Sequence, residues 1–200
     1  WKRPDARHAG LSRARVDGKE VMRPLYIFDL DGTLALIEHR LHFIQRPSLK
    51  CYDCGGANRK NCVQCSDLDA GWKADWRGFF AAVGKDEPNT AVIRTYKFLQ
   101  EAGAECWIWS GRSDECMAET KEWLAKHCGT KFGVFAPPEA FRMRKAGDYR
   151  DDVVVKSEWL AEIEPPEFNR LTAVFDDRAR VVEMWRNAGV SCFQVAPGEF

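Results

Sequence analysis

The feature that most constrains the fold of this chain is a short apolar run that ends in two carboxylates. Residues Leu25–Phe28 are typical of a buried strand, and the segment DLDGT (29–33) follows directly. Gly32 allows a sharp turn there, so Asp29 and Asp31 stand where the strand ends. One carboxylate in such a position can attack phosphorus, while the other gives a proton to the leaving oxygen and later takes one from water. Aspartates at strand ends are also common turn formers, and the pair alone leaves that alternative open.

Strand and helix patterns alternate along the rest of the chain. We expect further strands at 106–109, 132–136, 171–175 and 190–195. Helices are expected from a cap at Asn89 or Thr90 to Gly103, from a cap at Ser113 to Gly129, over 151–163 until Pro165-Pro166, and over 178–188. This alternation predicts an α/β fold, a Rossmann-like parallel sheet with flanking helices. Ligands of such sheets bind at the carboxyl ends of the strands.

The size and charge of the chain exclude several classes of protein. Its 200 residues suffice for one sizeable α/β domain with a small insertion. Lys+Arg and Asp+Glu number 30 each, so nucleic acid would have to be bound by a local patch rather than by an overall basic field. No apolar stretch spans a bilayer and no secretory signal is visible, which favours a cytoplasmic location. The basic, polar residues 1–20 are expected to be a linker or the edge of a preceding domain.

Further polar residues close the predicted strands and suit phosphoryl transfer, which needs a nucleophile, a metal and donors to the phosphate oxygens. Each role has a candidate: Asp29 as nucleophile, Asp31 as acid/base, Ser110 as a holder of one oxygen, Lys156 to offset negative charge, and Asp29, Asp31, Asp176 and Asp177 as a Mg²⁺ site. Taken singly, Ser110 could belong to a plain turn, Lys156 could be a solvated helix lysine, and Asp176-Asp177 could cap a helix.

The order of these motifs resembles that of the haloacid dehalogenase (HAD) superfamily of aspartyl phosphatases, over most of residues 25–195. The segments DLDGTLA, WSGR, RDDVVVK, FDDR and VVEMWRNAGVSCFQVAPGEF are similar to the 3′-phosphatase domain of phage-type polynucleotide kinase-phosphatases. The resemblance implies a HAD core at 21–45 and 87–200. It also implies a Mg²⁺-dependent enzyme of nucleic-acid repair that removes a 3′-phosphate from RNA or DNA ends through an aspartyl-phosphate, and in some cases opens a 2′,3′-cyclic phosphate.

The same resemblance implies a set of substrate-binding residues: Arg40, Arg112, Thr33, Gly111 and Asp152. Asp151 is the alternative to Asp152, because the chain carries one extra valine before Lys156. A kinase domain would precede this one in the full-length protein, although no GxxxxGK[ST] loop occurs here and this chain alone should lack kinase activity. If a phage encodes the protein, it would act in the cytoplasm of the host.

Two CxxC pairs distinguish the chain from that family. Cys51 with Cys54, and Cys62 with Cys65, can present four thiolates to one structural Zn²⁺. Two disulfides or free thiols are the alternative, which a reducing cytosol disfavours. We expect residues 46–86 to form a small zinc-stiffened cap that excludes water or shapes access for a polynucleotide end.

Two segments are candidates for contact with nucleic acid. The basic stretch Arg142–Lys145, with Arg150, suits a phosphate backbone, and a solvated loop is the alternative. Trp72 and Trp76 could stack an unpaired base, although their spacing favours one buried face of a helix. The competing functions are a small-molecule phosphatase such as a nucleotidase, since the fold does not set the substrate, and a zinc-containing binding module with an inactive core. No oligomeric state follows from the sequence.

Overall fold

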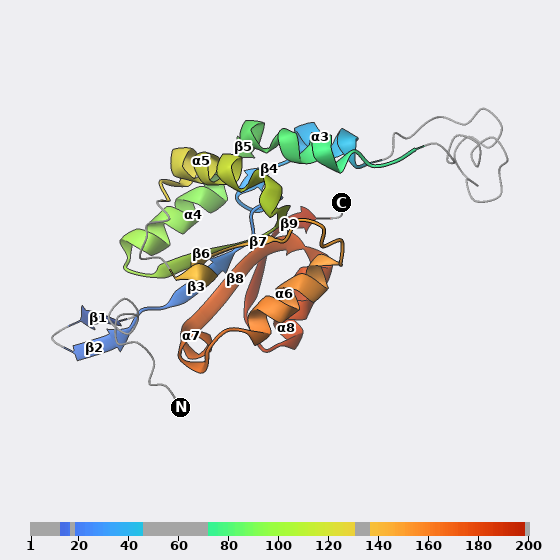
Figure 1. The fold of residues 1–200 in the computed structure, drawn as a ribbon. Coiled ribbons are helices and arrows are strands. Elements are labelled where there is room, and N and C mark those ends of the chain that lie inside the picture. Colours follow the sequence, from blue (N-terminus) through green and yellow to red (C-terminus); the bar gives the residue numbers. More distant parts are fainter. Residues whose placement is uncertain (1–12, 17–18, 46–71, 131–136, 199–200) are drawn as a thin grey trace.

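A five-stranded sheet forms the centre of the molecule in a computed structural model, which describes residues 13–16, 19–45, 72–130 and 137–198 (Figure 1). The strand order is β7-β6-β3-β8-β9, and every neighbouring pair is parallel. The strands are β3 (Leu25–Phe28), β6 (Glu105–Ser113), β7 (Phe141–Arg144), β8 (Leu171–Arg178) and β9 (Cys192–Gly198). The predicted α/β fold with a parallel sheet is therefore confirmed.

Alternation along the strands explains why helices cover both faces of the sheet. Leu25 and Ile27 of β3 point to one face, where they pack in a core with α8, and Phe28 points to the other. Figure 1 shows α4 and α5 on one side of the sheet and α6 and α8 on the opposite side. These helices are α4 (Thr90–Glu101), α5 (Met117–Cys128), α6 (Asp152–Ala161) and α8 (Ala179–Asn187).

Local signals set most helix ends where the sequence predicts them. Ser113 accepts a hydrogen bond from the Glu115 N–H at 3.3 Å and begins the turn η4 (Asp114–Cys116) that leads into α5. Gly129 ends α5 in a left-handed conformation, with φ at +72°. Asp151 caps α6 by accepting from the Val153 N–H at 2.9 Å.

Two expectations about secondary structure need correction. Arg142, Met143 and Arg144 of the basic stretch lie in the edge strand β7 rather than in a solvated loop, the alternative, and Met143 is buried in a cluster with Val83 and Cys116. The strand expected at 132–136 lies outside the described residues. Pro165-Pro166 does not merely end the third helix but begins α7 (Pro165–Arg170), because proline fits the first turn of a helix, where its missing N–H is not needed.

The insertion leaves and rejoins the core at neighbouring points. Strand β4 (Ala35–Leu36) pairs antiparallel with β5 (Glu87–Pro88), so the two ends of the insertion lie side by side. In the structure the insertion runs from the end of β4 to the start of β5, so it begins before the predicted start at residue 46. Its described parts are η1 (Glu38–Phe43), α3 (Trp76–Ala81) and η3 (Val83–Lys85). Cys51, Cys54, Cys62 and Cys65 lie outside the described residues, and the zinc-binding cap stays a prediction.

The segment expected to be a linker contains regular structure. Strands β1 (Arg13–Val16) and β2 (Lys19–Met22) pair as an antiparallel hairpin. Figure 1 shows this hairpin apart from the five-stranded sheet. None of the helices in the described ranges is long and apolar enough to cross a membrane.

Candidate active site

Polar side chains from three strands meet at one edge of the sheet. Asp29 follows β3 directly, Ser110 lies in β6, and Asp176 and Asp177 lie near the end of β8. Because β3 is parallel to both β6 and β8, the carboxyl ends of the three strands share this edge. A cavity of about 890 Å³ opens over it and includes Asp29 and Asp177 in its wall.

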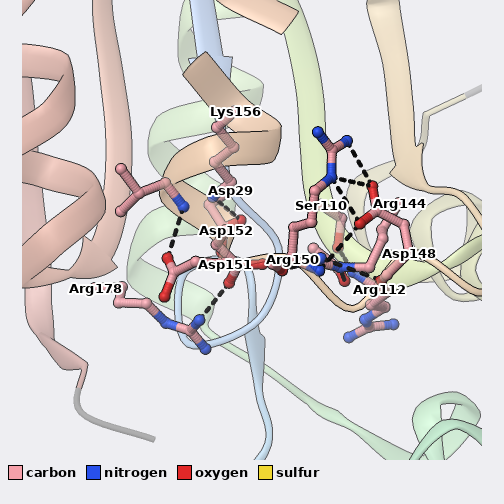
Figure 2. Close-up of polar contacts among 12 residues, drawn as sticks. Asp29, Ser110, Arg112, Arg144, Asp148, Arg150, Asp151, Asp152, Lys156 and Arg178 are labelled. Atoms are coloured by element: carbon pink, nitrogen blue, oxygen red, sulfur yellow. Dashed lines mark hydrogen bonds and ion pairs between the residues drawn. The ribbon is translucent and has the colours of Figure 1, made fainter. Parts of the chain in front are cut away.

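Three buried carboxylates form the floor of this cavity. Asp29, Asp176 and Asp177 each offer an oxygen, and these oxygens lie within 4.8 Å of one another. Lys156 of α6 is buried beside them and donates to Asp29 Oδ1 at 2.6 Å (Figure 2). It also donates to Asp176 Oδ2 at 2.8 Å. The predicted grouping of these four residues is therefore present in the structure.

The electrostatics of this cluster are dominated by crowded negative charge. Burial raises the pKa of Asp29 well above its ordinary value, against the lowering effect of Lys156. Burial and the neighbouring Asp176 raise the pKa of Asp177 to about 7. Burial disfavours the charge of Lys156, but Asp176 and Asp29 outweigh it, so the pKa of the lysine lies above its ordinary value. One ammonium group thus offsets three carboxylates, which leaves the cluster suited to a further cation.

Two glycines allow the chain to approach Asp177 closely. Gly32 has φ at +80°, and a Cβ there would overlap the Asp177 carboxylate. A Cβ at Gly198, the last residue of β9, would overlap the same carboxylate. Gln194 of β9 donates to the Asp177 backbone oxygen at 2.8 Å, and the Thr33 hydroxyl donates to Asp177 Oδ1 at 3.5 Å. Asp177 is therefore held in place from three sides.

Asp31 is held by two arginines rather than by the acidic cluster. Arg40 Nη2 donates to Asp31 Oδ1 at 2.7 Å, and Arg112 Nε donates to the same oxygen at 2.6 Å. Burial alone would raise the pKa of Asp31, but Arg112 and Arg40 outweigh it and hold the pKa below its ordinary value. Asp31 is not part of the three-carboxylate group, although the sequence analysis placed it in the Mg²⁺ site.

A second carboxylate, which sequence reasoning missed, joins the two arginines. Asp86 accepts from Arg40 Nε at 2.7 Å and also pairs with Arg112 Nη2. The side chains of Asp86, Arg40 and Arg112 are all fully buried. Trp123 of α5 donates to the Asp86 backbone oxygen at 2.7 Å. Asp86 stands just before β5 in a segment that resembles an ordinary turn, so no local signal marks it.

A chain of ion pairs borders the cavity beyond Gly111. Arg144, at the end of β7 and labelled in Figure 2, donates through Nε to the Gly111 backbone oxygen at 2.9 Å. Asp152 accepts from Arg144 on one oxygen and from Arg178 on the other. Asp151, the alternative to Asp152, instead caps α6 and pairs with Arg180. Of the two aspartates, it is Asp152 that joins the residues at the strand ends.

The predicted site residues fall into three groups. The first group lines the cavity: Asp29, Asp31, Gly111, Arg112, Asp152, Lys156, Asp176 and Asp177. The second group, Thr33, Arg40 and Ser110, is fully buried behind the cavity wall, with Ser110 Oγ accepting from the Arg112 N–H at 3.2 Å. The third group, the four cysteines of the CxxC pairs, lies outside the described residues. Arg178 was not singled out from the sequence, although it directly follows Asp176-Asp177.

Comparisons with known proteins agree with this geometry. A family model described as the polynucleotide kinase PNKP phosphatase domain matches residues 73–200. A chain in a solved Pnkp1/Rnl/Hen1 complex is 28% identical with a TM-score of 0.60, and the match covers 89% of this chain and 48% of that one. A chain in a solved Pnkp1/Rnl/Hen1 RNA repair complex is 25% identical with a TM-score of 0.59, covering 92% and 51%. The present chain thus spans about half the length of these solved chains.

Proposed function

The chain belongs to the family of polynucleotide kinase PNKP phosphatase domains, and from this premise we propose that it removes the 3′-phosphate from the end of a polynucleotide. The observation that carries the proposal is the position of Asp29. Its carboxylate lies at the carboxyl end of β3, 2.6 Å from Lys156 Nζ, in the wall of a cavity of about 890 Å³. A nucleophile so placed can reach a phosphate that enters the cavity.

In the first step, an Asp29 oxygen attacks phosphorus and the bond from phosphorus to the 3′ oxygen breaks. Asp31 gives its proton to the departing 3′ oxygen, so a free hydroxyl leaves and an aspartyl-phosphate remains on Asp29. The backbone at Gly111, in the cavity wall, suits a phosphate oxygen, whereas the Arg112 side chain is bonded to Asp31 and Asp86 and acts through Asp31. Lys156 limits the repulsion between the Asp29 carboxylate and the anionic ester.

In the second step, water attacks phosphorus and Asp31 takes its proton. The bond from phosphorus to Asp29 breaks, which restores the carboxylate and releases inorganic phosphate. The two arginines that hold Asp31 favour its charged form, as this second step requires. A bound dianionic phosphate acts in the opposite sense, because nearby negative charge raises the proton affinity of a carboxylate, and so it prepares Asp31 to act first as an acid.

The acidic cluster fits a magnesium ion. Asp29, Asp176 and Asp177 offer only hard carboxylate oxygens and are buried, and Lys156 pairs with two of them, Asp29 and Asp176. These three residues would hold Mg²⁺. The ion would supply positive charge that lowers the repulsion between nucleophile and phosphate.

Nucleic acid is the favoured substrate class on two grounds. The family is that of polynucleotide kinase phosphatase domains, and one of the two solved relatives is part of an RNA repair complex. RNA ends are thus natural first substrates to test, with DNA ends and 2′,3′-cyclic phosphates beside them. That a kinase domain precedes this one in a longer protein stays a prediction.

The test compares phosphate release from a 3′-phosphorylated oligonucleotide with release from the 5′-phosphorylated form of the same oligonucleotide and from mononucleotides. We expect Mg²⁺-dependent release from the 3′-phosphorylated end alone. Asp29→Asn should abolish turnover and leave the fold intact, because the amide fills the same space but cannot attack phosphorus. Strong turnover by that variant would refute the role of Asp29. A preference for mononucleotides would favour a nucleotidase instead.

A further inference from the structure

The cavity over the acidic cluster is much larger than a phosphate group. Its volume of about 890 Å³ is near the upper end of the range of typical ligand pockets, about 300 to 1,000 Å³. Space therefore remains for the rest of a substrate once a phosphate lies on Asp29. Two exposed aromatic residues outside the catalytic motifs, Trp76 and Tyr149, line the same cavity.

Trp76 lies at the start of α3, in the insertion, and is 49% exposed. Its ring lies 6.0 Å from that of Phe80 at an interplanar angle of 29°, and it meets Phe79 edge-on at 5.7 Å. Phe79 is in turn buried and packs against the guanidinium of Arg40 at 4.0 Å, so the indole rests on a fixed base. The sequence spacing favours a buried position for Trp76; the structure instead leaves it about half exposed, in the wall of the cavity.

Tyr149 lies between β7 and α6, and at 89% exposure it is the most exposed large aromatic of the described residues. The cavity wall also carries basic groups, among them Arg77, which follows Trp76 in the sequence, and Arg144. Arg77 is exposed and forms no ion pair with any other residue that the structure describes. Exposed aromatic rings next to basic side chains are the combination that binds single-stranded nucleic acid, because rings stack on bases and cations attract the backbone.

On this basis, we propose that Trp76 and Tyr149 form a base-stacking subsite for the last unpaired nucleotides of a polynucleotide 3′ end. The inference rests on the proposed function and adds to it. Phosphate binding on Asp29 would be common to every phosphate ester, whereas stacking on these rings would select esters that carry bases. The subsite is continuous with the catalytic cavity, so the base and the phosphate of one strand can occupy both at once.

The first experiment measures binding without turnover. In an Asp29→Asn background, the affinity for a single-stranded oligonucleotide is measured by fluorescence anisotropy, with Trp76→Ala, Trp76→Phe and Tyr149→Ala added one at a time. We expect Trp76→Ala and Tyr149→Ala each to weaken binding about tenfold, and Trp76→Phe to retain most of the affinity, because phenylalanine still offers a ring. The matched control is Phe98→Ala, which removes an aromatic that is 68% exposed on α4 and does not line the cavity; its affinity should be unchanged.

The second experiment uses turnover on two substrates in the otherwise unmutated protein. One is a 3′-phosphorylated oligonucleotide, and the other has the same backbone but lacks its last two bases. We expect Trp76→Ala to lower kcat/KM about tenfold for the first substrate and to leave it unchanged for the second. Equal losses on both substrates would show that Trp76 serves the fold only and would overturn the proposal, as would unchanged affinity and kcat/KM in both alanine variants.

Tyr149→Ala distinguishes a loss of binding from a folding defect, because a side chain so exposed contributes little to the packed core. The two proposals also fail in different ways. If the unmutated protein releases no 3′-phosphate, the proposed function fails, while the anisotropy series still decides whether the rings bind bases. If it releases 3′-phosphate equally well with and without terminal bases, the stacking subsite alone is refuted.

Discussion

At the scale of single residues, the most consequential group is one that takes no direct part in the proposed chemistry. Asp86 accepts hydrogen bonds from Arg40 and Arg112, the two arginines that hold Asp31. The side chains of Asp86 and both arginines are fully buried, and that of Asp31 is largely buried. Burial raises the pKa of Asp86, against the lowering effect of Arg40 and Arg112, so the two arginines favour its charged form. The position of the proposed acid/base therefore depends on a carboxylate from the insertion.

Asp86→Asn tests this dependence. The amide has nearly the same shape but carries no charge, so Arg40 and Arg112 lose part of their compensation in a buried site. We expect the free energy of unfolding to fall by about 3 kcal/mol, as measured by urea denaturation. We also expect kcat for phosphate release to fall at least tenfold, with the pH profile shifted because the arginines then act on Asp31 alone.

The matched control is Glu162→Gln, which removes a carboxylate that is 62% exposed and pairs with Arg142 at the surface. Exposed pairs contribute about 1 kcal/mol or less, so neither stability nor kcat should change noticeably. Wild-type kcat and stability in Asp86→Asn would show that the buried network has no role in positioning Asp31.

At the scale of secondary-structure elements, the core strands and helices bury thiols. Cys106 of β6, Cys128 of α5 and Cys192 of β9 are free cysteines packed among apolar side chains. Burial raises the pKa of each of these three thiols to about 12. Packed in this way, they behave as small hydrophobic residues.

From the raised pKa values of these thiols we predict that the folded protein loses stability in alkali. The thiol of a cysteine in the unfolded chain ionises at about pH 8.5. In the folded protein these three thiols keep their protons until about pH 12. Above about pH 8.5 the unfolded state therefore binds fewer protons than the folded state, and the free energy of unfolding falls as pH rises. Urea denaturation at pH 8 and pH 10 measures this fall, which should be smaller in Cys128→Ala.

The same thiols should resist iodoacetamide at pH 8.5 in the folded protein and react in urea. Peptide mass spectrometry separates them from the other cysteines of the chain. Rapid native-state labelling of Cys128 or Cys192 would contradict the burial of α5 and β9.

At the scale of the whole molecule, the insertion and the core share one site. Strands β4 and β5 pair where the insertion leaves and rejoins the core, and Arg40 of η1 reaches back to Asp31. The cavity has core residues such as Asp176 in one part of its wall and insertion residues such as Trp76 in another. A change in the conformation of the insertion should therefore affect both catalysis and the access of substrate to the cavity.

Zinc binding by the insertion can be tested on the whole chain. If the four cysteines of the CxxC pairs hold one structural ion, protein purified under reducing conditions should contain about one Zn²⁺ per chain. Cys62→Ser should lower the zinc content and the melting temperature, because the binding free energy of a structural zinc contributes to folding. Metal analysis and thermal denaturation measure both. Protein without zinc whose cysteines are joined in disulfides would refute the prediction.

Much of this architecture could be predicted because its signals are local. Apolar runs mark β3, β6, β8 and β9, and a serine cap and a left-handed glycine bound the segment that leads to and forms α5. Carboxylates that follow parallel strands must share one edge of the sheet, so the grouping of Asp29 with Asp176 follows from the strand pattern.

What the sequence by itself determined is thus the sheet, most of the helix boundaries and the acidic cluster at the strand ends. Only the tertiary structure decided that Asp86 joins Arg40 and Arg112, that Asp152 rather than Asp151 bridges the arginines, and that Trp76 opens into the cavity. The physical reason is that backbone periodicity depends on near neighbours, whereas the partner of a buried charge and the exposure of a ring depend on which distant segments the fold brings together.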